Sequence, residues 1–152
     1  ISVTGVQPCA LPILLQMDPN FSMAHFRLGL ALVHAGDFDA ALAELQVSKR
    51  LSNDRDVVAA LGRVHAMRGD RKDAEAAIAE LAERSKDTFV TAYAMAAIHA
   101  ALGESGAALD WLERAIDERS YWLIYLNVDP ALDALRAEPR FNGLRKRAGL
   151  PE

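Results

Sequence analysis

The chain has 152 residues, of which 51% are hydrophobic, 25% charged and 7% aromatic. This length suits one domain with a core of its own, and the composition excludes a disordered, collagen-like or coiled-coil chain. The formal net charge is −4, from 17 basic and 21 acidic residues. No overall positive field therefore attracts nucleic acid or an acidic membrane surface.

Alanine is the most informative residue type, with 28 alanines against six prolines and nine glycines. Alanine has the highest helix propensity, whereas strands favour β-branched and aromatic residues. We therefore expect an all-α fold. No apolar run approaches the 18 residues that a membrane-spanning helix needs, so we expect no membrane partner.

The first residues resemble a sequence of foreign origin. Val3 to Ile13 read VTGVQPCALPI, which is similar to the translation of a common sequencing-library adapter, VTGVQTCALPI, and differs from it only at Pro8. We therefore interpret residues 1–13 as a non-native leader outside the fold, with a genuine irregular leader as the alternative.

The chain has a single cysteine, Cys9, and no basic segment before Arg27. We expect a fragment of a cytoplasmic protein.

From residue 22 the sequence repeats with a period near 34 residues. Gly36, Gly69 and Gly103 are separated by 33 and 34 residues, and the same spacings relate Leu28, Leu61 and Met95, and Ala41, Ala74 and Ala108. Such a period indicates a solenoid of stacked units. Each unit shows one helical pattern before its glycine and a second one after it, as glycine ends helices and polar residues begin them. We expect three helix hairpins, at 22–54, 55–88 and 89–122.

These units resemble the tetratricopeptide repeat, whose pattern is W-x2-L-G-x2-Y, then A-x3-F, then P. The Leu-Gly pair is Leu28-Gly29 in the first unit and Leu61-Gly62 in the second, and it becomes Met95-Ala96 in the third. The aromatic positions hold other residues, namely His25, Leu32, Leu45, Val58, His65, Ile78, Ala92, His99 and Leu112. Residues 14–21 resemble the remnant of a preceding repeat. The resemblance implies a helix-turn-helix solenoid.

Beyond Arg119 the period stops and the most aromatic stretch of the chain, 120–126, begins. We expect residues 123–152 to form a C-terminal cap with helices near 131–136 and 139–148, because the last unit of a solenoid must be covered. This segment resembles the ending of repeat arrays in large bacterial proteins, through Asp129-Pro130, Leu132-Asp133, Leu135-Arg136, Pro139-Arg140-Phe141, Leu144 and Gly149-Leu150. The resemblance implies an upstream kinase, cyclase or winged-helix DNA-binding domain.

No pattern of residues points to catalysis. The histidines (His25, His34, His65 and His99) include no pair spaced i, i+4 for a shared zinc ion, and the chain has no phosphate-binding glycine loop or nucleophile motif. We expect no enzyme activity, no metal and no cofactor. The basic stretch 136–147 could contact nucleic acid or lipid, but cations also belong in the last turn of a helix. We expect no nucleic-acid binding by this segment.

The remaining candidate site is the inner wall of the solenoid, which the first helix of each repeat lines in the family that the chain resembles. The predicted partner-binding residues are Met23, Phe26, Leu30, Val33, Arg63, Met67 and Tyr93. An apolar wall with methionine and aromatic side chains suits an amphipathic helix or peptide, with an acidic residue near Arg63. Two functions remain open: an array that binds protein partners, or a regulatory or structural C-terminal tail that docks on its own upstream domain. In a third interpretation, the cap or the upstream chain covers this wall.

Overall fold

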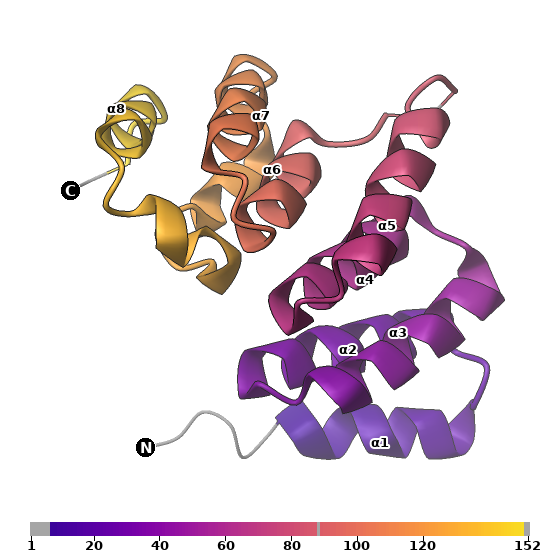
Figure 1. Cartoon of the computed structure of the whole chain (residues 1–152). Coiled ribbons are helices and arrows are strands. Elements are labelled where there is room, and N and C mark those ends of the chain that lie inside the picture. The colour runs from indigo at the N-terminus through magenta and orange to yellow at the C-terminus, as the bar shows by residue number, and fades with distance from the viewer. Residues whose placement is uncertain (1–6, 88, 151–152) are drawn as a thin grey trace.

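The computed structural model describes residues 7–87 and 89–150, and every regular element in these ranges is a helix. The predicted all-α class is therefore confirmed. Three helix pairs follow one another along the chain and stack with a progressive turn (Figure 1). The pairs are α2 (Ser22–Ala35) with α3 (Phe38–Ser52), α4 (Arg55–Arg68) with α5 (Arg71–Arg84), and α6 (Ala92–Ala101) with α7 (Ser105–Asp117).

Helix α1 (Gln7–Met17) precedes the first pair and packs against α2 (Figure 1). The expected leader ends inside this helix, since residues 1–6 lie outside the described part of the chain and 7–13 form the first turns of α1. The side chains from Leu11 to Met17 are all exposed or half-buried. Helix α1 therefore covers part of α2 without adding a buried side chain from these positions to the core.

The turns between paired helices contain glycine in a backbone conformation that other residues rarely adopt. Gly36 ends α2 with φ of 80°, and Gly69 ends α4 with φ of 88°. Only glycine populates this left-handed region without strain, which explains the regular glycine spacing. At the first turn, the Asp37 carboxylate then accepts a hydrogen bond from the backbone N–H of Ala40 at 3.1 Å and caps α3.

Small residues allow the two helices of a pair to approach closely. A β-carbon added to Gly29 would lie 2.7 Å from Cγ of Leu45, and one added to Gly62 would lie 2.7 Å from Cβ of Ala77. Carbon atoms that are not bonded to each other essentially never approach this closely. A larger residue at either glycine would therefore push the helices apart. Ala41, on the facing helix of the first pair, is completely buried.

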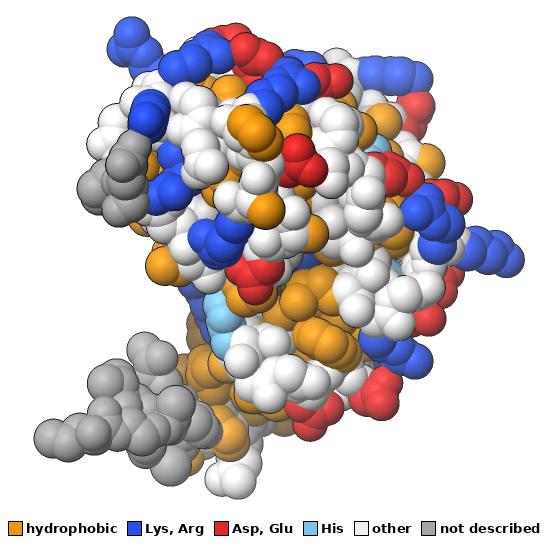
Figure 2. All heavy atoms as spheres, turned by 60° about the vertical axis from the view of Figure 1, so that its left-hand side comes forward, with side chains coloured by type: hydrophobic (Ala, Val, Ile, Leu, Met, Phe, Trp, Pro, Cys, Tyr) orange, Lys and Arg blue, Asp and Glu red, His pale blue; other side chains and the backbone are white. Residues whose placement is uncertain are grey.

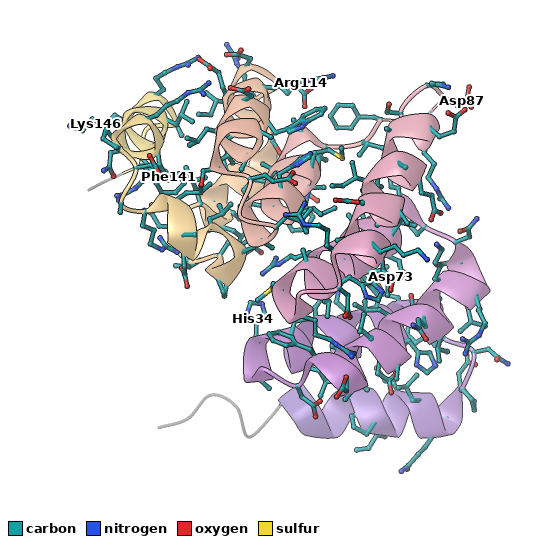
Figure 3. All side chains as sticks on the ribbon, viewed as in Figure 1. His34, Asp73, Asp87, Arg114, Phe141 and Lys146 are labelled. Atoms are coloured by element: carbon teal, nitrogen blue, oxygen red, sulfur yellow. The ribbon has the colours of Figure 1, made fainter. Side chains whose placement is uncertain are left out.

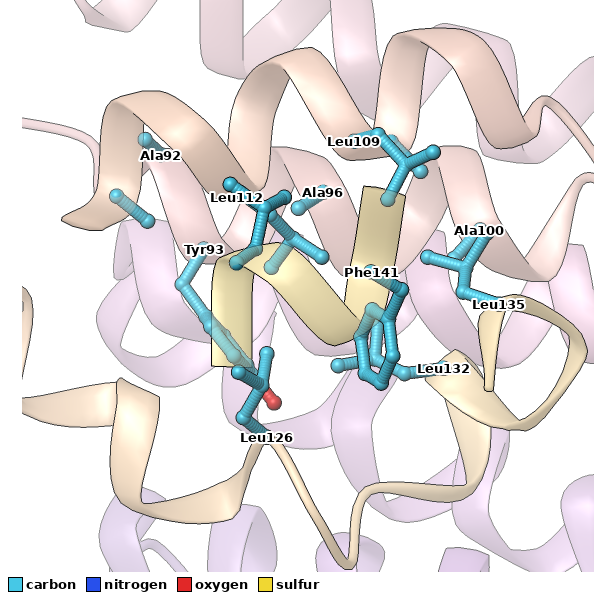
Figure 4. Close-up of a cluster of buried hydrophobic side chains, with 13 residues drawn as sticks. Ala92, Tyr93, Ala96, Ala100, Leu109, Leu112, Leu126, Leu132, Leu135 and Phe141 are labelled. Carbon is cyan, nitrogen blue, oxygen red and sulfur yellow. The ribbon is translucent and has the colours of Figure 1, made fainter. Parts of the chain in front are cut away.

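Among the residues that the structure describes, the core consists of three clusters of buried side chains along the stack. One lies between the first pair and α4, and a second joins the second and third pairs. The third joins α6 and α7 to the C-terminal elements, which are the 3-10 helices η2 (Tyr121–Tyr125) and η3 (Pro130–Leu135) and the helix α8 (Pro139–Arg147) (Figure 4). Leu132, Leu135 and Phe141 are completely buried there. The C-terminal elements thus share a continuous core with the last helix pair.

Candidate partner-binding surface

The structure divides the seven predicted wall residues into two groups. Phe26, Leu30 and Met67 are half-buried side chains that pack on the same cluster as the buried Val33. Met23 lies on α2 with Phe26 and Leu30 and is 51% exposed, whereas Met67 lies on α4. The second group consists of Arg63 on α4 and Tyr93 on α6, which contact the C-terminal segment instead.

Asp129, from the turn before η3, holds Arg63 and Tyr93. Its carboxylate accepts from Nη2 of Arg63 at 2.7 Å and from Nη1 at 3.2 Å, and the Tyr93 hydroxyl donates to Oδ2 at 2.9 Å. Oδ1 also accepts from the backbone N–H of Ala131 at 2.9 Å. The Asp129 side chain is 4% exposed and that of Arg63 is 20% exposed. One carboxylate therefore ties the C-terminal segment to the second and third helix pairs.

Tyr93 takes part in this network only as a donor. Burial raises the pKa of its hydroxyl far above the ordinary value, and the negative charge of Asp129 and the hydrogen bond to it raise the pKa further. The tyrosine therefore keeps its proton under all ordinary conditions and keeps donating to Asp129. Since Tyr93 is only 5% exposed, it contacts the chain's own C-terminal segment and offers almost no surface to a partner.

The open part of the wall lies on α2 and the adjoining part of α4. Figure 2 shows hydrophobic side chains in a recessed area at the height of these two helices, below the C-terminal elements. Met23, Phe26, Leu30 and Met67 are the predicted wall residues that keep exposed or half-buried apolar surface. These side chains leave apolar surface accessible, which a helix or peptide could cover.

Comparison with protein-family models gives three matches to the tetratricopeptide repeat, at residues 22–46, 57–80 and 90–114. Each match begins in or just before the first helix of a pair and ends in the second helix. The chain belongs to the tetratricopeptide-repeat family. Searches of curated proteins and of solved structures returned no significant match. Tetratricopeptide repeats generally serve as protein-interaction modules and non-catalytic scaffolds, which indicates a protein partner for this chain.

The histidines in the repeat positions that usually hold aromatic residues bind carboxylates of the second helix or its cap. Nδ1 of His25 lies 2.6 Å from Oε2 of Glu44, and Nδ1 of His99 lies 2.7 Å from Oε2 of Glu104. His65 contacts Asp70 more loosely, at 3.5 Å. These pairs join the helices of one repeat.

Among the described residues, no group of three or more histidine, cysteine, aspartate or glutamate side chains could hold a metal ion.

His25 has an acceptor at each ring nitrogen. Nδ1 faces Glu44, and Nε2 lies 3.0 Å from the carbonyl oxygen of Pro19. Burial by itself lowers the pKa of His25, but the hydrogen bonds to Glu44 and to the Pro19 carbonyl outweigh it, and the net pKa is raised. Only the doubly protonated ring can donate to both acceptors, so this site in the first repeat favours the imidazolium form.

The basic C-terminal stretch is largely occupied by contacts within the chain. Arg140 pairs with Asp110 at 2.8 Å, and Arg147 pairs with Glu113 at 2.6 Å, so that α8 is bound to the acidic face of α7. Arg136 donates to the carbonyl oxygen of Asn127 at 2.6 Å.

In the described ranges, no helix is long and apolar enough to cross a membrane.

Sequence reasoning did not find the role of Asp129. The Asp-Pro pair indicates a helix start, and Asp129 does cap η3 through Ala131. Its second role depends on Arg63, which lies 66 residues earlier in the chain. No local spacing relates these two positions, although an arginine on an otherwise apolar wall is a signal that some carboxylate must face it.

Proposed function

We propose that the chain is a non-catalytic protein-interaction module that binds a helix or peptide on the open part of its inner wall. The observation that carries this proposal is the unequal covering of the wall. Asp129 and the C-terminal segment occupy the wall at Arg63 and Tyr93, whereas Met23, Phe26 and Leu30 on α2 keep accessible apolar surface. We place the site on α2 and on the end of α4 that carries Met67.

The spacing of the apolar side chains on this surface suits one short helix or peptide. Its apolar side chains recur at intervals of three and four residues along α2, which matches the way an amphipathic helix presents its own apolar face. Methionine side chains such as Met23 and Met67 adapt to different partner shapes because they are unbranched and flexible. The partner contact would therefore depend mainly on Phe26 and Leu30, with the methionines filling the remaining space.

The test is a titration of labelled amphipathic helical peptides against the chain and single variants. Phe26→Ala and Leu30→Ala should each weaken binding by about 1–3 kcal/mol, as truncated anchor residues commonly do. Leu51→Ala is the matched control, because Leu51 is an exposed leucine on α3, outside the wall. Folded variants of Phe26 and Leu30 that bind as tightly as the Leu51 variant would contradict the proposed site.

The second candidate is a regulatory or structural tail that docks on another domain of the same protein. It is favoured by η2 and the turn after it, where Tyr121, Ile124, Tyr125 and Val128 are exposed. These exposed side chains are apolar, whereas the core contacts of η2 are made by the half-buried Trp122 and Leu123. Binding of an upstream domain that is lost in Ile124→Ser, and kept in Leu30→Ala, would favour this candidate.

A further inference from the structure

Helix α2 carries an exposed stripe in which apolar and basic side chains alternate. Met23, Arg27, Leu30 and His34 follow one another at spacings of four, three and four residues, so they share one face of the helix. Met23, Arg27 and His34 are exposed and Leu30 is half-buried. His34 lies at the end of α2, on the side of the molecule where the C-terminal elements lie (Figure 3).

The basic side chains of this stripe differ from most cations of the chain. Elsewhere, cations join neighbouring helix pairs, as in the Arg68–Asp39 pair at 2.6 Å, the Arg71–Glu104 pair at 2.7 Å and the Lys49–Glu80 pair at 2.7 Å. Within the described part of the chain, Arg27 and His34 have no ion-pair or hydrogen-bond partner. Their polar groups face solvent beside apolar surface.

The other charges of the wall are balanced within the chain. Asp129 neutralises Arg63. Asp56, in the first turn of α4, lies 3.9 Å from Arg55. The open stripe of α2 is thus left with one permanent positive charge, on Arg27, and one imidazole N–H donor, on His34.

We infer that this wall binds an acidic amphipathic helix, whose carboxylates meet Arg27 and His34 while its apolar face covers Met23, Phe26 and Leu30. The inference rests on the proposed function and adds the charge of the partner. Arg27 and His34 are seven residues apart, which is about 10 Å along a helix. Two carboxylates spaced i, i+7 on a partner helix match this distance, and leucines between them face the apolar positions.

The experiment uses three synthetic helical peptides of equal length with the same leucine face. They carry glutamate, glutamine or lysine at two flanking positions spaced i, i+7. We expect the glutamate peptide to bind the chain about tenfold more tightly than the lysine peptide, with a difference that shrinks as salt is added. Arg27→Glu should reverse this order. Lys72→Glu is the control of equal charge change, because Lys72 is exposed on α5, and it should leave the order unchanged.

Three results would overturn the inference in distinguishable ways. If all three peptides bind equally, and Leu30→Ala weakens each of them, the wall is a peptide site without charge preference, so the proposed function stands and the acidic partner does not. If no peptide binds, the proposed function fails together with the inference. If a nucleic acid duplex binds in a manner sensitive to Arg27→Glu while no peptide does, the stripe serves a different class of partner.

Discussion

Replacing Asp129 by alanine tests how strongly the C-terminal segment is tied to the inner wall. The change leaves the Arg63 guanidinium without its carboxylate, and it removes the acceptor of the Tyr93 hydroxyl and of the Ala131 backbone N–H. Removing one partner of a buried ion pair costs about 3–5 kcal/mol. Because the Arg63 side chain is 20% exposed, water can solvate it in part. We therefore expect a loss near the lower value, about 3 kcal/mol of unfolding free energy.

Urea unfolding followed by far-ultraviolet circular dichroism measures this loss, and a thermal melt should show a midpoint lower by about 6–12 °C for a chain of this size. Asp117→Ala is the matched control, because Asp117 forms an exposed ion pair with Arg147 on the surface of α7. Exposed pairs contribute at most about 1 kcal/mol. A loss below about 1 kcal/mol for Asp129→Ala, or equal losses for both variants, would refute the reasoning.

A double variant separates the unpaired charge from the lost contacts. Arg63→Met combined with Asp129→Ala removes the guanidinium that Asp129→Ala leaves without a carboxylate. We expect the double variant to be more stable than Asp129→Ala alone, because an uncompensated charge is costlier than a missing pair. If the double variant is less stable by the full sum of the two single changes, Arg63 and Asp129 are not energetically coupled.

Three further predictions concern the repeats and the first residues. Ala41→Leu should overpack the first helix pair and cost about 1–3 kcal/mol, while Ala43→Leu at an exposed position should be nearly neutral in the same unfolding assay. The raised pKa of His25 in the folded chain means that its contribution to stability is complete below the unfolded pKa and is lost as pH rises through the folded pKa. The unfolding free energy should thus decrease as pH rises above about 6.5, the ordinary pKa of histidine, and His25→Gln should flatten this profile. Deleting residues 1–13 should lower the melting midpoint by less than about 4 °C, and a larger decrease would show that this segment stabilises the fold.

The fold could be predicted from the sequence because each repeat needs the same residue types at the same positions, and these positions recur at regular intervals. Gly36 and Gly69 end helices in a left-handed conformation, and Gly29 and Gly62 lie where a β-carbon would clash with the facing helix. Each requirement is met by residues close in sequence, so spacing alone reveals it. Ala41 likewise is buried because the helix that follows each turn must pack closely on the one before it.

The division of the wall could not be predicted, because it depends on contacts between distant and non-repeating segments. Asp129 reaches Arg63 and Tyr93 from a region where the period has ended, and the 3-10 helices η2 and η3 have no regular apolar spacing that would place them. The sequence indicated Arg63 as a site for an acidic residue. The structure shows that the chain supplies this residue itself, which leaves α2 as the open part of the wall.

Hydrogen exchange measured with and without a bound amphipathic peptide tests the central claim, that partners bind on α2, most directly. Binding there should slow the exchange of backbone amides in Ser22–Ala35 and in the last turns of α4, because covered helices open less often. The amides of residues 140–147, in α8, should exchange at the same rate in both states. Protection confined to Tyr121–Tyr125 or to α8, with α2 unchanged, would contradict the account.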